Sequence, residues 1–226
     1  MAYYSYDNGR RGGFLSSLPP VTRNLIIINV IVFVASLLNQ NFMIGNFALF
    51  YPTSPYFHWW QVVTHMFMHG GFWHIFFNMY TLAIFGPVLE NQWGSKKFLL
   101  FYFVVGIGAA LCHNLVMHLQ ITQAAAAGNI ALAQSLMRIP TIGASGAIYG
   151  VLLGFAMLFP NAELRLIFLP FFPLKAKWLI LVFAAIELMT GVMGTQDGVA
   201  HFAHLGGMLF ALILILFWKK KGQMYN

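Results

Sequence analysis

Ser145 is the residue in this chain best suited to act as a nucleophile. It stands in the run GASG at residues 143–146, at the start of an apolar segment. Small neighbours leave room for a substrate backbone, and a backbone N–H near a helix N-terminus can face a developing oxyanion. The same glycines can instead serve helix packing, because Gly146, Gly150 and Gly154 recur at four-residue spacing.

His204 is the matching candidate for the general base. It lies in a second apolar segment, where Gly207 and Ala211 form a small-xxx-small pair. Such a pair can press against the glycines after Ser145 and bring the two side chains to one level. A neutral imidazole beside a serine hydroxyl can take its proton, although a buried histidine is more often only a hydrogen-bonded core residue. Asp197 lies about 10 Å along the helix axis from His204, so the spacing predicts a Ser–His dyad.

Three further side chains are candidates to assist this pair. His74 and Asn78 stand at i and i+4, on one face of a helix, and both can donate hydrogen bonds to an oxyanion. Tyr149 follows Ser145 by one helical turn, and we expect its ring to stack on His204.

Two other polar groups in apolar segments have open roles. His65 and His69 also stand at i and i+4, a spacing that can bind zinc or a haem iron. No HExxH motif and no nearby carboxylate accompany them, so we expect no metal and no cofactor. Glu187 is either a functional intramembrane acid or a hydrogen-bonded packing residue, whereas Glu90 is expected to be structural.

The composition places most of the chain in lipid. Of its 226 residues, 60% are hydrophobic and 8% are charged, against about 25% charged in a soluble domain. The formal net charge is +7, but the basic residues stand in short segments between apolar runs, which indicates membrane orientation rather than nucleic-acid binding.

Six apolar runs approach the length of about 20 residues that a spanning helix needs. Backbone polar groups in lipid must be paired internally, so these runs are expected to be helices and the protein an all-α membrane bundle. The runs are Leu25–Leu38, Val62–Phe85, Phe98–Val116, Ile142–Phe159, Trp178–Met193 and Val199–Trp218.

The basic residues predict the orientation of these six spans. All but one of the 12 Lys and Arg residues fall on one side, so the positive-inside rule places both termini in the cytoplasm of a cell (plasma or inner) membrane. We expect a polar cytoplasmic tail over 1–22, a six-helix membrane domain over 23–218 and a short basic tail over 219–226. The single exception is Arg138.

Several motifs together resemble the rhomboid family of intramembrane serine proteases. The resemblance covers roughly residues 22–218. The motifs are His69, His74-xxx-Asn78 and Gly86-xxx-Glu90 in the second run, GASG with Tyr149 in the fourth, and Ala203-His204-Leu205-Gly206-Gly207 in the sixth.

The resemblance implies a compact six-helix bundle that cleaves peptide bonds in or near the transmembrane helices of substrate proteins in the lipid bilayer. It implies that Ser145 is the nucleophile and His204 the base, that His74, Asn78 and the Ser145 N–H form an oxyanion hole, and that Tyr149 stacks on His204. It also likens the fifth helix and the loop before the sixth to a gate and a cap.

The chain departs from the family pattern at two positions. Gln61 follows Trp60 where the family commonly has arginine, and Ala211 replaces a glycine. A non-catalytic rhomboid-like membrane chaperone or binding protein remains an alternative, as does a transporter or other membrane protein that binds metal or haem through its histidines.

Overall fold

The computed structural model describes residues 13–166, 169–194 and 199–223. Most of the predicted N-terminal tail, residues 1–12, lies outside the described residues, as do residues 224–226 of the basic tail. Asp197 and most of the loop before the last helix also lie outside them.

The described chain is mostly helical, and five of its helices are long and apolar enough to cross a membrane. A sixth apolar helix, α8, is shorter, with 14 residues. Many large apolar side chains on the long helices point outward, including Leu38 on α2 and Met193 on α9, which are 85% and 73% exposed. The long helices are α2 (Pro20–Leu38), α5 (Phe72–Trp93), α6 (Ser95–Ala126), α9 (Ala176–Met193) and α10 (His201–Lys220), and the shorter one is α8 (Ser145–Leu158).

Short elements connect these helices. An antiparallel hairpin between α8 and α9 was not predicted; it pairs Glu163 with Lys175 and Leu164 with Leu174. The hairpin strands are β1 (Glu163–Leu166) and β2 (Leu169–Lys175), and the short helices are α1 (Phe14–Ser17), α3 (Gln40–Phe47), α4 (Gln61–Thr64), the 3-10 helix η1 (His65–Phe67) and α7 (Ile130–Leu136).

The prediction of one continuous second helix over Val62–Phe85 is wrong. The chain is helical over α4 and η1, leaves the helix at Met68, and starts α5 at Phe72. Gly70 and Gly71 stand in this break. Gly71 caps α5 with an extended backbone, and glycine is the residue least favourable to a continuous helix after proline.

The third helix is longer than predicted. Helix α6 continues to Ala126 because the Ala-rich sequence after Gln120 keeps a high helix propensity. Gly128 ends this helical stretch with a positive φ of 76°, and α7 follows, N-capped by Asn129.

Glycines seat α8 between α6 and α10 at the centre of the bundle. A Cβ on Gly146 would lie 2.6 Å from Ala109 Cβ, and one on Gly207 would lie 1.9 Å from the Gly146 carbonyl oxygen. Gly150 likewise faces α10, but Gly154 faces side chains of α5 and α6 instead. The stripe after Ser145 therefore packs two faces of the bundle, and only its first two glycines meet α10.

Glu90, which was expected to be structural, ties α5 to the start of α2. Its carboxylate accepts hydrogen bonds from the backbone N–H groups of Val21 (2.9 Å) and Thr22 (2.7 Å) and from the Thr22 hydroxyl (2.8 Å). Ser95 at the start of α6 donates a fourth bond of 2.7 Å. A carboxylate at a helix N-terminus also compensates the positive end of the helix dipole.

Gln61 anchors the segment between α3 and α4. Its side chain is fully buried, and its oxygen accepts from the backbone N–H of His58 at 3.1 Å. Its amide nitrogen donates to the Tyr56 carbonyl at 2.9 Å. Although glutamine stands where the family commonly has arginine, the loop therefore has a buried polar side chain at its centre.

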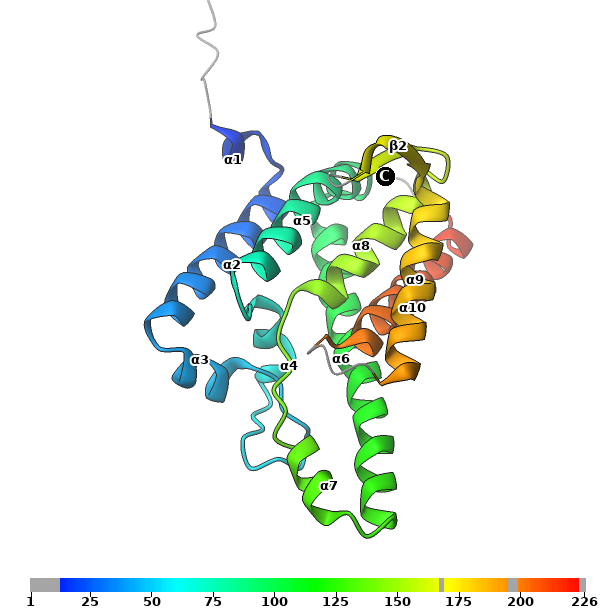
Figure 1. Cartoon of the computed structure of the whole chain (residues 1–226). Helices are drawn as coiled ribbons and strands as arrows, with labels where there is room; N and C mark the ends of the chain where they lie inside the picture. The colour runs from blue at the N-terminus through cyan, green and yellow to red at the C-terminus, as the bar shows by residue number, and fades with distance from the viewer. Residues whose placement is uncertain (1–12, 167–168, 195–198, 224–226) are drawn as a thin grey trace, which may run out of the picture.

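Figure 1 shows the start of α2, the end of α10 and the hairpin at one end of the molecule, and α7 with the lower part of α6 at the other. The described Lys and Arg residues follow the same division. All of them except Arg138, just after α7, stand at the start of α2 or α6, in or beside the hairpin, or at the end of α10.

Candidate active site

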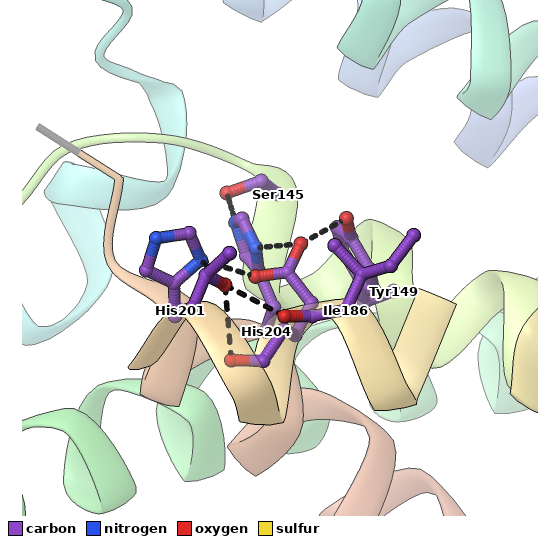
Figure 2. Close-up of polar contacts among 7 residues, drawn as sticks. Ser145, Tyr149, Ile186, His201 and His204 are labelled. Atoms are coloured by element: carbon purple, nitrogen blue, oxygen red, sulfur yellow. Dashed lines mark hydrogen bonds and ion pairs between the residues drawn. The ribbon is translucent and has the colours of Figure 1, made fainter. Parts of the chain in front are cut away.

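Ser145 and His204 meet where α8 begins and α10 has completed its first turn. His204 Nε2 lies 2.8 Å from Ser145 Oγ, within hydrogen-bond distance (Figure 2). His204 is buried, while Ser145 is half-buried. The close contact of Gly146 and Gly207 holds the two helices near enough for these side chains to touch.

The ring of Tyr149 lies flat against the imidazole of His204. The ring centroids are 4.2 Å apart and the planes differ by 9°. The Tyr149 hydroxyl donates to Oε1 of Glu187 on α9. Rotation of the His204 ring is therefore blocked on one face by an aromatic ring. The hydroxyl of that ring is itself held by a hydrogen bond, drawn as a dashed line in Figure 2.

His74 presents a donor toward Ser145. The Gly70 backbone N–H donates to His74 Nδ1 at 3.3 Å, so a neutral His74 carries its proton on Nε2. A Cβ built on Gly143 would lie 2.9 Å from His74 Nε2 and 3.4 Å from Ser145 Oγ. These two atoms thus border one small space, which stays open because Gly143 has no side chain and a φ of 132°.

Asn78 lies one turn further along α5 than His74. Its side-chain nitrogen Nδ2 is buried, and it has no hydrogen-bond partner among the described residues. An unpaired buried donor is costly in a resting protein, and such a cost is typical of a group that awaits a ligand or a transition state.

A cavity of about 20 Å³ lies beside Ser145. His65, Thr141 and Ala200, just before α10, are among the residues that line it. Its size is sufficient for one water molecule, which needs about 10–15 Å³.

His65 and His69 are not a pair on one helix face. His65 lies on η1 with Nδ1 2.8 Å from the Gln61 carbonyl oxygen, whereas His69 lies in the break before α5. The His69 ring contacts the ring of His74 edge-on, with centroids 4.9 Å apart. Within the three described ranges, no group of three or more His, Cys, Asp and Glu residues could hold a metal ion.

Glu187 is the site residue whose role the sequence left open. It is 6% exposed and contacts three side chains of the site. Oε1 lies 3.0 Å from His204 Nδ1, and Oε2 lies 2.7 Å from His201 Nδ1. An acid is rare in an apolar helix, which made Glu187 a candidate functional residue. Sequence spacing, however, cannot place a residue of α9 against one of α10.

Comparison with known proteins shows the family of this chain. Residues 56–221 match the rhomboid domain family. The chain belongs to the rhomboid family. It is a multi-pass integral membrane protein of that family, and the residues named above lie within the matched region.

Three curated relatives illustrate how distant the similarity is. RHOMBOID-like protein 12, mitochondrial, of Arabidopsis thaliana is 29% identical over 194 residues, which cover 85% of this chain and 56% of that protein. Rhomboid protease AarA of Providencia stuartii is 27% identical over 86% of this chain and 70% of its own length. Putative rhomboid protease YdcA of Bacillus subtilis is 29% identical over 74% of this chain and 71% of its own.

This rhomboid chain thus spans little more than half of the Arabidopsis relative and about 70% of the two bacterial ones. The similarity extends to proteins named mitochondrial and chloroplastic as well as to bacterial ones.

Proposed function

We propose that this rhomboid is a serine endopeptidase that hydrolyses peptide bonds in or near the transmembrane segments of other membrane proteins. The observation that carries the proposal is the 2.8 Å contact between Ser145 Oγ and His204 Nε2. A serine hydroxyl is a weak nucleophile until an adjacent base can take its proton. Relatives named rhomboid protease support the same reaction class.

In the first half of the reaction, Ser145 Oγ attacks the scissile carbonyl carbon while its proton moves to His204 Nε2. The carbonyl oxygen becomes an oxyanion that accepts hydrogen bonds from His74 Nε2–H, Asn78 Nδ2–H and the backbone N–H of Ser145. The last of these lies at the first residue of α8, where N–H groups have no partner within the helix. Collapse of the intermediate breaks the C–N bond, and the leaving amine takes the proton from His204.

In the second half, water hydrolyses the acyl-enzyme. His204 takes a proton from the water as its oxygen attacks the ester carbon, and it returns a proton to Ser145 Oγ as the ester bond breaks. The product leaves as a carboxylic acid. The small cavity beside Ser145 offers a position for this water.

The proposed arrangement in the membrane is a bundle of six crossings, made by the five long helices and α8, which is the fourth crossing in chain order. At about 1.5 Å per residue its 14 residues extend about 21 Å, less than the hydrocarbon thickness of about 30 Å. At least one end of α8 therefore lies below the membrane surface, and in the proposed arrangement this is the end that begins with Ser145. The basic end of the molecule faces the cytoplasm in this arrangement.

The test is cleavage of a model transmembrane substrate by the purified protein in liposomes. Wild type and Ser135→Ala should cleave it, and Ser145→Ala should not. Ser135 is a matched control because it is exposed on α7 and its hydroxyl only donates to the Leu132 carbonyl. A serine-directed phosphonate should form an adduct on Ser145.

Substrate binding without cleavage by wild type would favour a non-catalytic membrane chaperone instead. Cleavage by Ser145→Ala at the wild-type rate would show that the nucleophile is elsewhere.

A further inference from the structure

The carboxylate of Glu187 contacts His204 at Nδ1, the ring nitrogen that does not contact Ser145. Glu187 reaches it from α9, a helix that carries neither the serine nor the histidine. His204 Nδ1 is 3.0 Å from Glu187 Oε1, and His204 Nε2 is 2.8 Å from Ser145 Oγ. The three side chains therefore form one continuous line of polar contacts (Figure 2).

The neighbours of Glu187 indicate that its side chain is an ionised acceptor. Tyr149 donates its hydroxyl proton to Oε1. His201 Nδ1 lies 2.7 Å from Oε2 and 3.0 Å from Thr190 Oγ1. The Thr190 hydroxyl can donate its one proton to the Ile186 carbonyl, which lies 2.7 Å away. With Glu187 ionised, His201 can carry its proton on Nδ1 and donate it to Oε2.

The same reasoning favours one tautomer of His204, with the proton on Nδ1. Its Nδ1 is buried, and among the described residues it makes no hydrogen bond of good angle, but the Glu187 oxygen lies within ion-pair distance. A buried N–H beside a carboxylate is favoured, whereas a bare nitrogen lone pair there would face negative charge. With the proton on Nδ1, the Nε2 lone pair is free to accept the proton of Ser145. Hydrogen bonds of resting active sites are often poorly aligned and tighten in the reacting complex.

We propose that Glu187 is a positioning residue that extends the Ser145–His204 pair to a three-membered Ser–His–Glu arrangement. The inference rests on the proposed function and deepens it. The carboxylate holds the His204 proton on Nδ1 and stabilises the imidazolium that forms when Nε2 takes the serine proton. Glu187 itself does not become protonated, because the proton on Nε2 passes directly to the leaving amine.

A purely structural role would also place Glu187 here, because the cluster connects α9 to α8 and α10. The two roles differ in what they change. A structural brace affects the amount of folded protein and its melting temperature, whereas a positioning residue affects the turnover of the folded protein and the tautomer of His204.

The first experiment compares the kinetics of Glu187→Gln and Glu90→Gln with wild type. The glutamine amide can donate to His204 Nδ1 and so favour the wrong tautomer. A comparable change in another serine protease lowers kcat by about 10⁴, and we expect Glu187→Gln to lower kcat at least about 100-fold with little change in KM. Glu90 is a matched control, since its carboxylate is equally buried but binds the start of α2.

A fall in kcat of less than threefold for Glu187→Gln would overturn the proposal, provided that Ser145→Ala is inactive in the same assay. An inactive wild type, or full activity of Ser145→Ala, would instead count against the proposed function. These results differ from the one that would overturn the role of Glu187, so the two failures can be told apart.

The second experiment needs no variant of Glu187 and so does not depend on whether one folds. In wild-type protein labelled with ¹⁵N-histidine, nitrogen NMR shows which ring nitrogen of each histidine is protonated. Reaction of Ser145 with the phosphonate perturbs the His204 signals and assigns them. We expect a proton on Nδ1 and none on Nε2 in the resting protein. A proton on Nε2 would overturn the proposal, even if the phosphonate still labels Ser145.

Discussion

Ser145 Oγ and His204 Nε2 lie 2.8 Å apart although 59 positions separate the two residues in the chain. No local feature of either helix produces this contact. It follows from the backbone approach of α8 to α10 at Gly146 and Gly207, which leaves no room for a side chain at Gly207. Packing and chemistry are therefore coupled at the start of α8.

Removing one oxyanion donor should lower turnover without weakening substrate binding. His74→Ala and Asn78→Ala each remove a donor that acts only on charge developed in the transition state. Such a loss typically lowers kcat by about 10²–10³. Steady-state kinetics on the model substrate should show this fall with KM nearly constant. Wild-type rates in both variants would show that the oxyanion lies elsewhere.

Chelators should leave cleavage unchanged, because the proposed reaction needs no metal to polarise the carbonyl. The measurement is the rate of substrate cleavage before and after treatment with a strong chelator. Activity lost to a chelator and restored by zinc would favour a metal enzyme.

Phosphonate labelling of Ser145 should likewise persist in folded His65→Ala, because His65 lines the cavity but does not contact the nucleophile.

Gly207→Ala should destabilise the bundle. The added Cβ would lie 1.9 Å from the Gly146 carbonyl oxygen, so α8 and α10 must separate. Overpacking typically costs about 1–3 kcal/mol, and the melting temperature in detergent should fall together with activity. Gly45→Ala is the matched control, because a Cβ on Gly45 meets no atom within 4 Å. Equal melting temperatures for the two variants would show that the helices adjust freely.

Much of the site was predictable because its signals are local. The i, i+4 spacing of His74 and Asn78 lies within one helix, α5. The small-residue spacing near Ser145 and His204 predicted the approach of α8 to α10, and the placement of Tyr149 one turn after Ser145 predicted the ring stack.

The features that the sequence did not predict depend on how distant helices pack, or on a helix break that has only a weak signal in the sequence. The contact of Glu187 with His204 depends on how α9 is rotated against α10. The break at Gly70 and Gly71 lies inside an apolar run, so hydropathy alone does not reveal it. Gly154, the third glycine of the stripe, faces α5 and α6 because α8 is packed on more than one side.

Glu90→Gln should lower stability without altering the chemistry of the folded protein. An amide keeps one acceptor but replaces the other with a donor, which would face the N–H groups at the start of α2. Hydrogen bonds to a charged group contribute about 1.5–3 kcal/mol each. Thermal unfolding in detergent should therefore occur at a lower temperature. Glu163→Gln is the control, since Glu163 is exposed on β1. Equal melting temperatures of the two variants would mean that the hydrogen bonds of Glu90 do not stabilise the start of α2.

Both termini should lie in the cytoplasm, opposite the loop between α6 and α7. The uneven distribution of basic residues supports this orientation. The measurement uses single cysteines at Gln123 and Gln223, both exposed, in a Cys112→Ala background that removes the native thiol. An impermeant thiol reagent should label the cysteine at 123 in intact cells, and the cysteine at 223 only after lysis. Labelling at 223 in intact cells would mean that the two positions lie on one side or that the orientation is reversed, and labelling at 123 then separates these cases.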